Sequence, residues 1–381
     1  MSAFTFNLAE PAQLALATIH GKSTKGIPSW VIHPMEHDVI DKLAGVQPGT
    51  YRRAPEATYL QMQRNIKTCL LDQYIPTNPL SMGDSSYDDE SEHTATTGAE
   101  EIMLDGIRID SPEAVVEHME KFVFPSLRKA IREFDENKRA IEIIESERQT
   151  QKTLGPAILK SGYGFIQFPH LAYIAYGYEN YFLAYALYPE IIEKHFSLQA
   201  DLALLNNRAA LRVYKKGNLP PLCRLDHDMA DSRGTLVDIK SLDKIWFPHF
   251  ARCLEPLLKS DVKLIWHCDG NLSQMVPRFL DVGLSGFQGF QYEDNMDYEK
   301  ICSMKTRHGN SLLIIAGVSV TRTLPHGRTD DVKREMKWLV KNGPKTGLFL
   351  GCSSTITPGV PWENIQTLIE GLKYYMEHGR A

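Results

Sequence analysis

The chain has 381 residues, of which 43% are hydrophobic and 23% charged, and its formal net charge is −5. These values are typical of a globular protein, and the acidic balance argues against a nucleic-acid binder, which usually carries a basic stripe. No run of about 18 apolar residues predicts a membrane span, and the N-terminus lacks the basic and apolar segments of a secretory signal, so we expect a cytoplasmic protein.

Short apolar segments alternate with amphipathic segments along most of the chain. Residues 1–26 are predicted to form an arm or a short helix that precedes the main domain. Eight predicted strands follow, at Ser29–His33, Thr68–Gln73, Ala157–Phe165, Leu222–Asp226, Leu264–Asp269, Gly286–Tyr292, Leu312–Val318 and Leu348–Cys352. The predicted helices cover Pro112–Glu133, Lys138–Thr153, Pro189–Lys215 and residues 240–259, 272–282, 296–307, 329–342 and 361–378.

Strands that alternate with helices predict a parallel sheet with helical crossovers. Eight such strands predict an α/β protein with a single (β/α)8 TIM barrel over residues 27–381. An open, doubly wound sheet is the alternative, but no predicted strand is followed by a Gly-rich phosphate-binding turn. Residues 76–106 lack clear periodicity and are predicted to be a long polar insertion.

The six cysteines are scattered along the chain and match no disulfide framework. They are Cys69, Cys223, Cys253, Cys268, Cys302 and Cys352. Because a cytoplasm would keep them reduced, each is predicted to be either a small core residue or a thiolate ligand.

Polar side chains follow five of the predicted strands, at the point where each strand ends. They include His33, Glu36 and His37, then Asp226, His227 and Asp228, then His267, Asp269 and Asn271, then Glu293 and Asp294, and finally Cys352 and Ser353. A barrel brings the carboxyl ends of its strands to one rim, where barrel active sites lie. Helix capping could explain one polar strand end, but it explains five poorly. We therefore expect these side chains to share a pocket.

His267 and Asp269 stand two residues apart, so a strand points both to one side and sends Cys268 to the other. With Cys352 they offer an imidazole, a carboxylate and a thiolate, a possible Zn²⁺ set that leaves one position open. Alternatively, His267 binds a backbone carbonyl, Asp269 caps the next helix and Cys352 is a packed thiol. Cys268 could replace Asp269 if the strand bulges.

Asp226 and Asp228 share one face by the same alternation. They could act as a base, hold a polar group of a substrate or ligate a metal, and Glu293 could also orient a substrate. Arg224 and Arg233 flank the two aspartates, so a plain salt-bridge network is an equal alternative.

Candidate substrate-binding residues come from the strand ends and from a tyrosine-rich segment around the third strand. From the strand ends we take His33, Glu36 and Asn271. From the segment we take Tyr163 and Tyr176, because a buried tyrosine hydroxyl needs a polar partner, although such aromatic residues also build cores.

Four motifs together resemble the uroporphyrinogen decarboxylase superfamily, from about Trp30 to the end of the chain. They are Leu-Asp-His-Asp-Met-Ala at 225–230, Trp-His-Cys-Asp-Gly-Asn at 266–271, Ala-Gly-Val-Ser at 316–319 and Gly-Cys-Ser-Ser-Thr-Ile-Thr-Pro-Gly-Val-Pro-Trp-Glu-Asn at 351–364. The superfamily includes the decarboxylase and the zinc-dependent methyltransferases that work with corrinoid proteins. The decarboxylase carries an Arg-Gln-Ala-Gly-Arg segment for substrate carboxylates, whereas the corresponding segment here has no arginine, which favours the methyltransferase branch.

The methyltransferases bind zinc through a histidine, a cysteine two residues on and a cysteine in the C-terminal motif. His267 and Cys352 match the first and last of these, Asp269 stands at the middle position and Cys268 lies one place early. A carboxylate ligand suits an oxygen-containing substrate better than a soft thiolate does. The resemblance therefore implies zinc on His267, Asp269 and Cys352.

The function expected from this resemblance is transfer of a methyl group from a small methylated molecule to cobalamin carried by a corrinoid protein. A methoxylated aromatic donor and a homodimer fit the same expectation. One alternative is a cofactor-free decarboxylase in which Asp226 or Asp228 stabilises a cationic intermediate. Another is a metal-dependent hydrolase on the same barrel.

Overall fold

The structure is a computed structural model that describes residues 7–77, 101–217, 219–289 and 291–380. Its strands are β1 Leu70–Leu71, β2 Met103–Leu104, β3 Ile107–Arg108, β4 Leu159–Lys160, β5 Gly162–Tyr163, β6 Leu222–Asp226, β7 Lys263–His267, β8 Gly286–Gln288, β9 Leu313–Val318 and β10 Leu348–Cys352. Its first helices are α1 Glu10–Ile19, α2 His37–Ala44, α3 Thr50–Arg53, α4 Pro55–Asn65, α5 Pro112–His118, the π-helix η1 Met119–Val123, α6 Phe124–Arg132, α7 Glu136–Leu154, α8 Tyr173–Tyr176 and α9 Tyr178–Leu187. The remaining helices are α10 Pro189–Gly217, α11 Ile239–Ile245, α12 Phe247–Leu258, α13 Val276–Val282, the 3-10 helix η2 Tyr292–Asp294, α14 Tyr298–Ser303, α15 Thr323–His326, α16 Thr329–Asn342 and α17 Trp362–His378.

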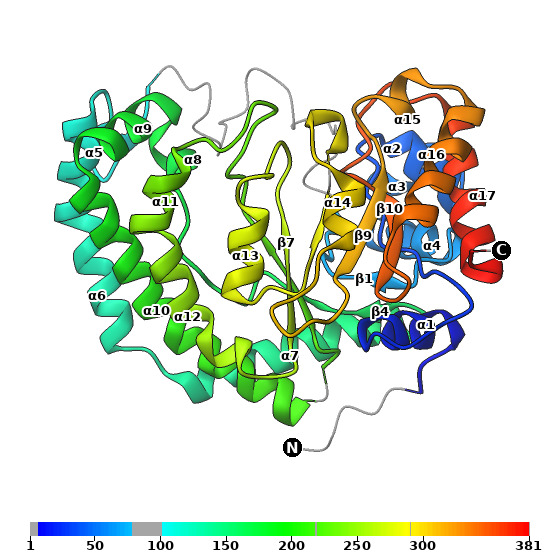
Figure 1. Ribbon diagram of the computed structural model, residues 1–381, viewed down its shortest axis with the longest axis horizontal. Helices are drawn as coiled ribbons and strands as arrows, with labels where there is room; N and C mark the ends of the chain where they lie inside the picture. The colour runs from blue at the N-terminus through cyan, green and yellow to red at the C-terminus, as the bar shows by residue number, and fades with distance from the viewer. Residues whose placement is uncertain (1–6, 78–100, 218, 290, 381) are drawn as a thin grey trace.

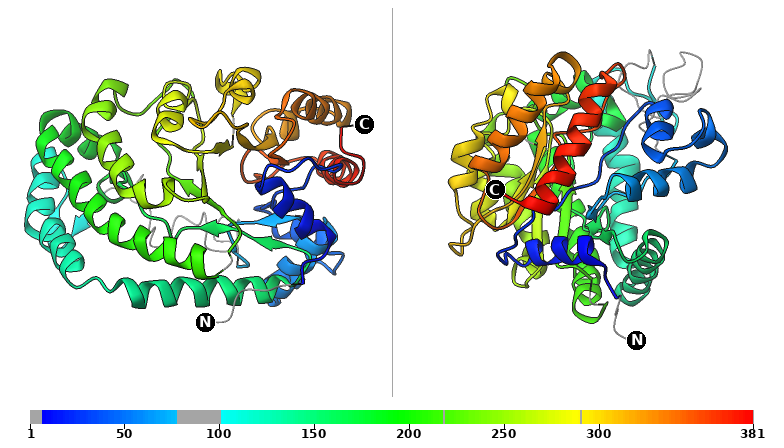
Figure 2. Two further views of the ribbon diagram at one scale, coloured as in Figure 1. Left: turned by 60° about the horizontal axis from the view of Figure 1, so that its bottom comes forward. Right: turned by 90° about the vertical axis from the view of Figure 1, so that its right-hand side faces the viewer.

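A curved parallel sheet of six strands, in the order β10-β9-β8-β7-β6-β5, forms the centre of the molecule (Figure 1). Helices surround it on the outside, as both views in Figure 2 show. Parallel contacts extend the sheet beyond both edges: Ser29 pairs with Leu350 of β10, Trp30 pairs with Leu70, and β1 pairs with β4. The predicted parallel sheet with helical crossovers is confirmed, and the architecture is TIM-barrel-like.

Side chains alternate between an inner and an outer face along the central strands, as a pleated strand requires. Leu222, Ile265 and Phe349 belong to a buried cluster enclosed by the sheet. Trp266 and Leu350 belong to a second buried cluster, which packs the outer face against the helices. This alternation decides which strand-end residues can meet inside the sheet.

Helix α1 lies near the amino-terminal ends of the strands (Figure 1). It buries Ala12, Ala15 and Ile19. The backbone N–H of Ala9 donates to the carbonyl of Pro156, just before β4, at 2.8 Å. The short helix expected in this part of the chain is therefore present, and the division into an arm and a barrel domain stays a prediction.

Several segments differ from the expected elements. Helices α2, α3, α4, α8, α9 and α15 were not predicted. The first two are joined by the carboxylate of Asp41, which accepts hydrogen bonds from the backbone N–H groups of Gly49 and Tyr51 at 2.6 and 2.7 Å. In the expected polar insertion, β2 and β3 form an antiparallel hairpin through Asp105 and Gly106, whose φ angles of 48° and 79° suit a tight turn. Residues 78–100 of that insertion lie outside the described residues.

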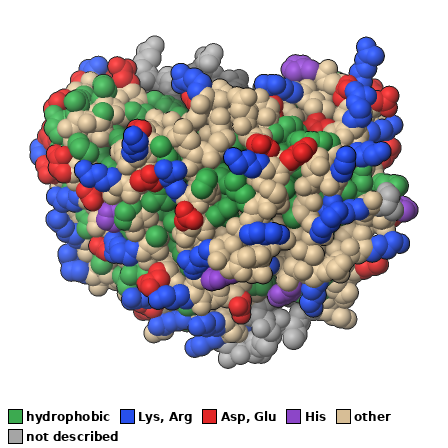
Figure 3. Space-filling view, in the orientation of Figure 1, with side chains coloured by type: hydrophobic (Ala, Val, Ile, Leu, Met, Phe, Trp, Pro, Cys, Tyr) green, Lys and Arg blue, Asp and Glu red, His purple; other side chains and the backbone are tan. Residues whose placement is uncertain are grey.

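Acidic and basic side chains are interspersed over the face of the molecule shown in Figure 3. No basic stripe dominates this face, in agreement with the composition. Among the described helices, none is both long and apolar enough to cross a membrane.

Candidate active site

Two aspartates and a histidine meet at the carboxyl ends of β6 and β7. Asp226 is the register partner of His267 in the parallel ladder. Ligand atoms of Asp226, Asp228 and His267 all lie within 4.8 Å of one another. We call these three residues the acid–imidazole cluster. The alternation predicted for Asp226 and Asp228 therefore brings both carboxylates to the side that His267 occupies.

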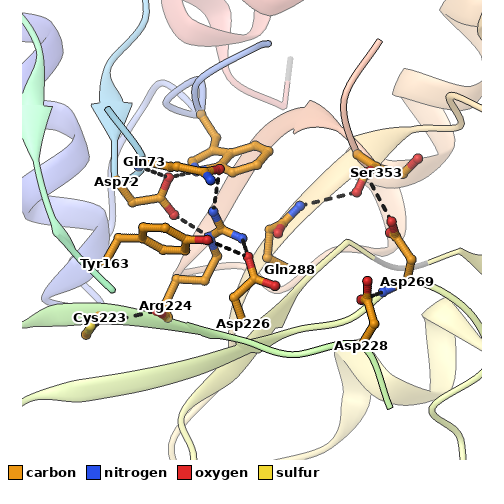
Figure 4. Close-up of polar contacts among 12 residues, drawn as sticks. Asp72, Gln73, Tyr163, Cys223, Arg224, Asp226, Asp228, Asp269, Gln288 and Ser353 are labelled. Atoms are coloured by element: carbon orange, nitrogen blue, oxygen red, sulfur yellow. Dashed lines mark hydrogen bonds and ion pairs between the residues drawn. The ribbon is translucent and has the colours of Figure 1, made fainter. Parts of the chain in front are cut away.

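A buried ion-pair chain holds Asp226 in place (Figure 4). Its Oδ2 accepts from the Arg224 guanidinium at 2.7 Å and from the Tyr163 hydroxyl at 3.0 Å. The Arg224 Nε also donates to Asp72 at 2.6 Å. Arg224 and Asp72 are only 4% and 2% exposed, whereas Asp226 is 29% exposed. Both contacts use Oδ2, so neither involves the other carboxylate oxygen of Asp226.

Asp72 is a functional neighbour that the sequence analysis missed. Besides Arg224, it accepts hydrogen bonds from the Trp30 indole at 3.2 Å and from the backbone of Gln73 at 2.7 Å. Burial alone would raise the pKa of Asp72, but Arg224, with help from the Gln73 backbone and Lys160, more than offsets this, so the pKa lies below its ordinary value. Asp72 stands at the polar end of a predicted strand, the same signal that identified the other strand ends.

Buried polar atoms without partners surround the cluster. Among the described residues, the Nδ1 of His267 and the Oδ1 of Asp269 are buried and have no hydrogen-bond partner. The other carboxylate oxygen of Asp269 accepts from the Ser354 hydroxyl at 3.2 Å. Burial raises the pKa of Asp269; His267 opposes this shift, and the negative charge of Asp228 adds to it. Orphaned buried polar atoms in a native fold indicate an absent ligand, ion or water.

Cys352, a member of the predicted ligand set, is not grouped with this cluster among the described residues. Phe349 belongs to the inner cluster, so Cys352, three residues on, faces outward with Leu350. The glycine before it faces Trp30 inside the sheet. Burial, and secondarily the charge of Glu335 on α16, raises the pKa of the Cys352 thiol. The packed-thiol alternative therefore describes Cys352.

Cys268 also lies on the outer face, as the strand alternation predicted. Its Sγ accepts from the backbone N–H of Met229 at 3.3 Å and donates to the carbonyl of Asp269 at 2.9 Å. The strand does not bulge to bring this thiol inward, so the Cys268 thiol faces away from the acid–imidazole cluster.

The residues of the acid–imidazole cluster fit a divalent metal. One imidazole and two carboxylates are nitrogen and oxygen ligands that Zn²⁺ accepts, and three protein ligands leave a position open for a substrate. The orphaned atoms of His267 and Asp269 are consistent with a site built for an additional group. Of the predicted ligand set, only His267 belongs to this group among the described residues.

His33 and Glu36 lie at the same end of the sheet but contact other partners. The buried ring of His33 stacks on Tyr59, whose hydroxyl lies 3.5 Å from Nδ1. Burial lowers the pKa of His33 to about 4, with Asp72 opposing this shift. Glu36 accepts from the backbone N–H of Gly359 at 3.2 Å, which ties the loop after β10 to the start of α2.

Three other predicted site residues make hydrogen bonds outside the acid–imidazole cluster. The Tyr176 hydroxyl lies 2.8 Å from Nδ1 of His118 on α5. Asn271 caps its own turn through its side-chain oxygen. Glu293 accepts a hydrogen bond from the Ser319 hydroxyl, just after β9, at 2.5 Å. The structure does not group these three residues with the acid–imidazole cluster.

His227 faces away from the two aspartates that flank it, and its neutral ring holds the loop after β5. Its Nε2 accepts from the backbone N–H of Leu171 at 2.9 Å, and burial lowers its pKa from 6.5 to about 3. As the pH falls below 6.5, the unfolded chain takes up a proton at this residue and the folded chain does not, so stability falls.

The wild-type free energy of unfolding should fall between pH 6.5 and about pH 4.5, and His227 should account for about 2–3 kcal/mol of that fall, since each pKa unit corresponds to about 1.4 kcal/mol. This part of the fall should be absent in His227→Gln. Urea unfolding at several pH values measures this change. The exposed His308→Gln is the control and should follow the wild-type curve. An identical pH dependence in wild type and His227→Gln would contradict the assigned neutral ring.

Two cavities are lined in part by residues of the acid–imidazole cluster. The first, of about 370 Å³, is lined by Tyr163, Phe168, His170, Gln199 and Asp226 among others. The second, of about 380 Å³, is lined by residues that include Tyr178, Asp228, Asp231, Arg233 and Asp269. Asp226 therefore faces one cavity and Asp228 faces the other.

Comparison with known proteins supports the family resemblance found in the sequence. Residues 228–375 match the model of the uroporphyrinogen decarboxylase family, which confirms that resemblance over the part of the chain that contains Asp228 and His267. No curated protein matches the chain in sequence.

Among solved structures, a methyltransferase from Methanosarcina mazei is similar with a TM-score of 0.57 at 14% identity, covering 96% of this chain and 98% of that chain. This likeness shows a shared fold. A putative vitamin-B12 independent methionine synthase from Listeria monocytogenes is 12% identical over 62% of this chain and 67% of that chain, with a TM-score of 0.36.

Proposed function

We propose that this protein is a metal-dependent methyltransferase that moves a methyl group from a small methylated substrate to cobalamin carried by a corrinoid protein. The observation that carries the proposal is the acid–imidazole cluster at the carboxyl ends of β6 and β7. Support comes from the uroporphyrinogen decarboxylase family match and from the fold shared with a methyltransferase. From the parallel contacts of Ser29 and Trp30 we also propose that the sheet closes into an eight-stranded barrel. The cluster would then lie at the carboxyl ends of the barrel strands, where barrel active sites lie.

Zn²⁺ is the metal we propose for Asp226, Asp228 and His267. When bound, the metal would supply Lewis acidity to a substrate oxygen and so weaken the bond from that oxygen to the methyl group. Arg224 and Tyr163 hold Asp226 through one oxygen, which orients the other oxygen of the carboxylate.

A methoxylated aromatic compound is the donor we propose. The first cavity carries aromatic side chains close to the cluster: the rings of Phe168 and His170 stack with their centroids 4.3 Å apart, and Tyr163 touches Asp226. Flat aromatic walls with a few polar groups suit a small planar ligand.

The alternative of a cofactor-free decarboxylase needs cationic groups for the carboxylates of its substrate. The arginine at the cluster, Arg224, already pairs with Asp72 and Asp226. Three carboxylates, those of Asp226, Asp228 and Asp269, also surround the space where such a substrate would bind. A poly-anionic substrate would meet repulsion there, so the geometry favours the methyltransferase.

The proposal is tested by incubating the zinc-loaded protein with reduced cobalamin and a panel of methoxylated benzenes. We expect the absorbance of cob(I)alamin to convert to that of methylcobalamin with at least one donor, and a chelator should stop the conversion. Release of carbon dioxide from uroporphyrinogen that is unaffected by the chelator would instead support the decarboxylase.

A further inference from the structure

Methyl transfer between two nucleophiles is an in-line displacement, which sets a geometric requirement on the site. The acceptor must approach the methyl carbon from the side opposite the donor oxygen. The electron pair of the acceptor forms the new bond to the carbon as the O–CH₃ bond breaks. The pair from the broken bond stays on the donor oxygen, which takes a proton from water. An enzyme for this reaction therefore needs access from two sides.

We propose that the two cavities at the acid–imidazole cluster are separate donor and acceptor chambers. This inference rests on the proposed function and deepens it. Asp226 lines the first cavity and Asp228 lines the second, while ligand atoms of both lie within 4.8 Å of each other and of His267. Figure 4 shows Asp226 beside Tyr163 and Arg224, and Asp228 beside Asp269. The reacting methyl group lies where the two chambers meet.

The first cavity is the donor chamber. Aromatic rings of Tyr163, Phe168 and His170 line it, and Leu202 of α10 closes it on the helical side. The amide of Gln199 fixes the wall, because its Oε1 accepts from the backbone N–H of His170 at 2.6 Å. A volume of about 370 Å³ accepts one small aromatic molecule.

The second cavity is the acceptor chamber. Its wall is the loop after β6, which carries Ser232 and Arg233 at the surface, and the Arg233 side chain is 90% exposed. The loop is held by its own contacts, since Asp231 binds Arg233 and the carbonyl of Asp231 accepts from the backbone N–H of Asn271 at 2.8 Å. A protein that carries the acceptor can reach this loop from solvent.

A matched pair of tryptophan substitutions separates the two chambers. Leu202→Trp fills the first cavity and Ser232→Trp fills the second, and neither residue belongs to the cluster. Binding of methoxybenzene is measured by calorimetry on the zinc-loaded protein, and transfer is followed with cob(I)alamin. Leu202→Trp should weaken methoxybenzene binding at least about tenfold and leave the KM for cob(I)alamin unchanged. Ser232→Trp should raise that KM by a similar factor and leave donor binding unchanged.

His170→Leu, on the exposed wall of the first cavity, is a second donor-side variant in case Leu202→Trp fails to fold. Equal effects of the donor-side and acceptor-side variants on both ligands would overturn the assignment of two chambers, as would wild-type donor binding in both donor-side variants. If the wild type binds methoxybenzene in a Leu202-dependent manner but transfers no methyl group, the proposed function fails and the donor chamber stands. If it neither binds nor transfers, both fail.

Discussion

His267→Ala and Asp228→Asn should each lower zinc affinity by more than the roughly 10–100-fold loss that removal of an outer hydrogen-bonding partner causes. Both residues offer a ligand atom to the acid–imidazole cluster. Methyl transfer to cob(I)alamin should fall below detection in both variants, because weakening of the O–CH₃ bond depends on the bound metal. Competition with a chromophoric chelator measures the affinity, and circular dichroism checks the fold.

Cys352→Ala is the control for this experiment. The family motif makes Cys352 a zinc ligand, whereas the structure buries its thiol on the outer face beside Glu335. We therefore expect unchanged zinc affinity and a loss of stability of about 1–2 kcal/mol, as for a small core truncation. If Cys352→Ala loses zinc while Asp228→Asn retains it, the motif describes the metal site and the structural assignment is wrong.

Arg224→Met should destabilise the fold by about 3–5 kcal/mol, because removal of one partner leaves a buried carboxylate without a counter-charge. Asp72 is 2% exposed, and its Oδ2 accepts from Arg224 at 2.6 Å. The same change frees Asp226 from its guanidinium partner, so zinc affinity should fall as well. Urea unfolding and the chelator competition measure the two effects on one protein.

Arg233→Met is the matched control for Arg224→Met. Arg233 also pairs with an aspartate, at 2.6 Å, but its side chain is 90% exposed. Exposed pairs contribute little to stability, so the control should unfold at nearly the same urea concentration as wild type. The double variant Asp72→Leu/Arg224→Met should recover part of the loss, since an apolar replacement removes both buried charges. Equal destabilisation by both arginine variants would contradict the role given to burial.

Strand alternation predicted much of the site from the sequence. It placed Asp226 and Asp228 on one side of β6, and it placed His267 and Asp269 opposite Cys268. These assignments needed only the period of two and the boundaries of the strands, and both are local properties of the chain. The polar ends of parallel strands then had to meet at one edge of the sheet.

Cys352 was predicted as a ligand because it ends a strand and matches a motif, and neither signal depends on the face of β10 that it occupies. Phe349 is apolar and points inward, so a residue three positions later must point outward. Asp72 also lies at the end of a predicted strand, but it was not among the predicted site residues.

Other parts of the site depend on tertiary contacts that no local pattern reveals. The first cavity combines residues of β5 and β6 with Gln199 and Leu202 of α10, which are distant in sequence. The ion pair of Asp72 with Arg224 spans 152 positions along the chain. Tyr176 was selected from an aromatic segment, but its hydroxyl binds His118 because α8 packs near α5.

Stepwise zinc loading of the metal-free wild-type protein tests the central claim most directly. Bound zinc and the rate of cob(I)alamin methylation from a methoxylated benzene are measured on the same samples. We expect both to rise together and to level off at one zinc per chain, with neither rise in His267→Ala. Full methylation activity in the metal-free protein, or zinc bound at wild-type affinity by His267→Ala, would contradict a metal centre at Asp226, Asp228 and His267.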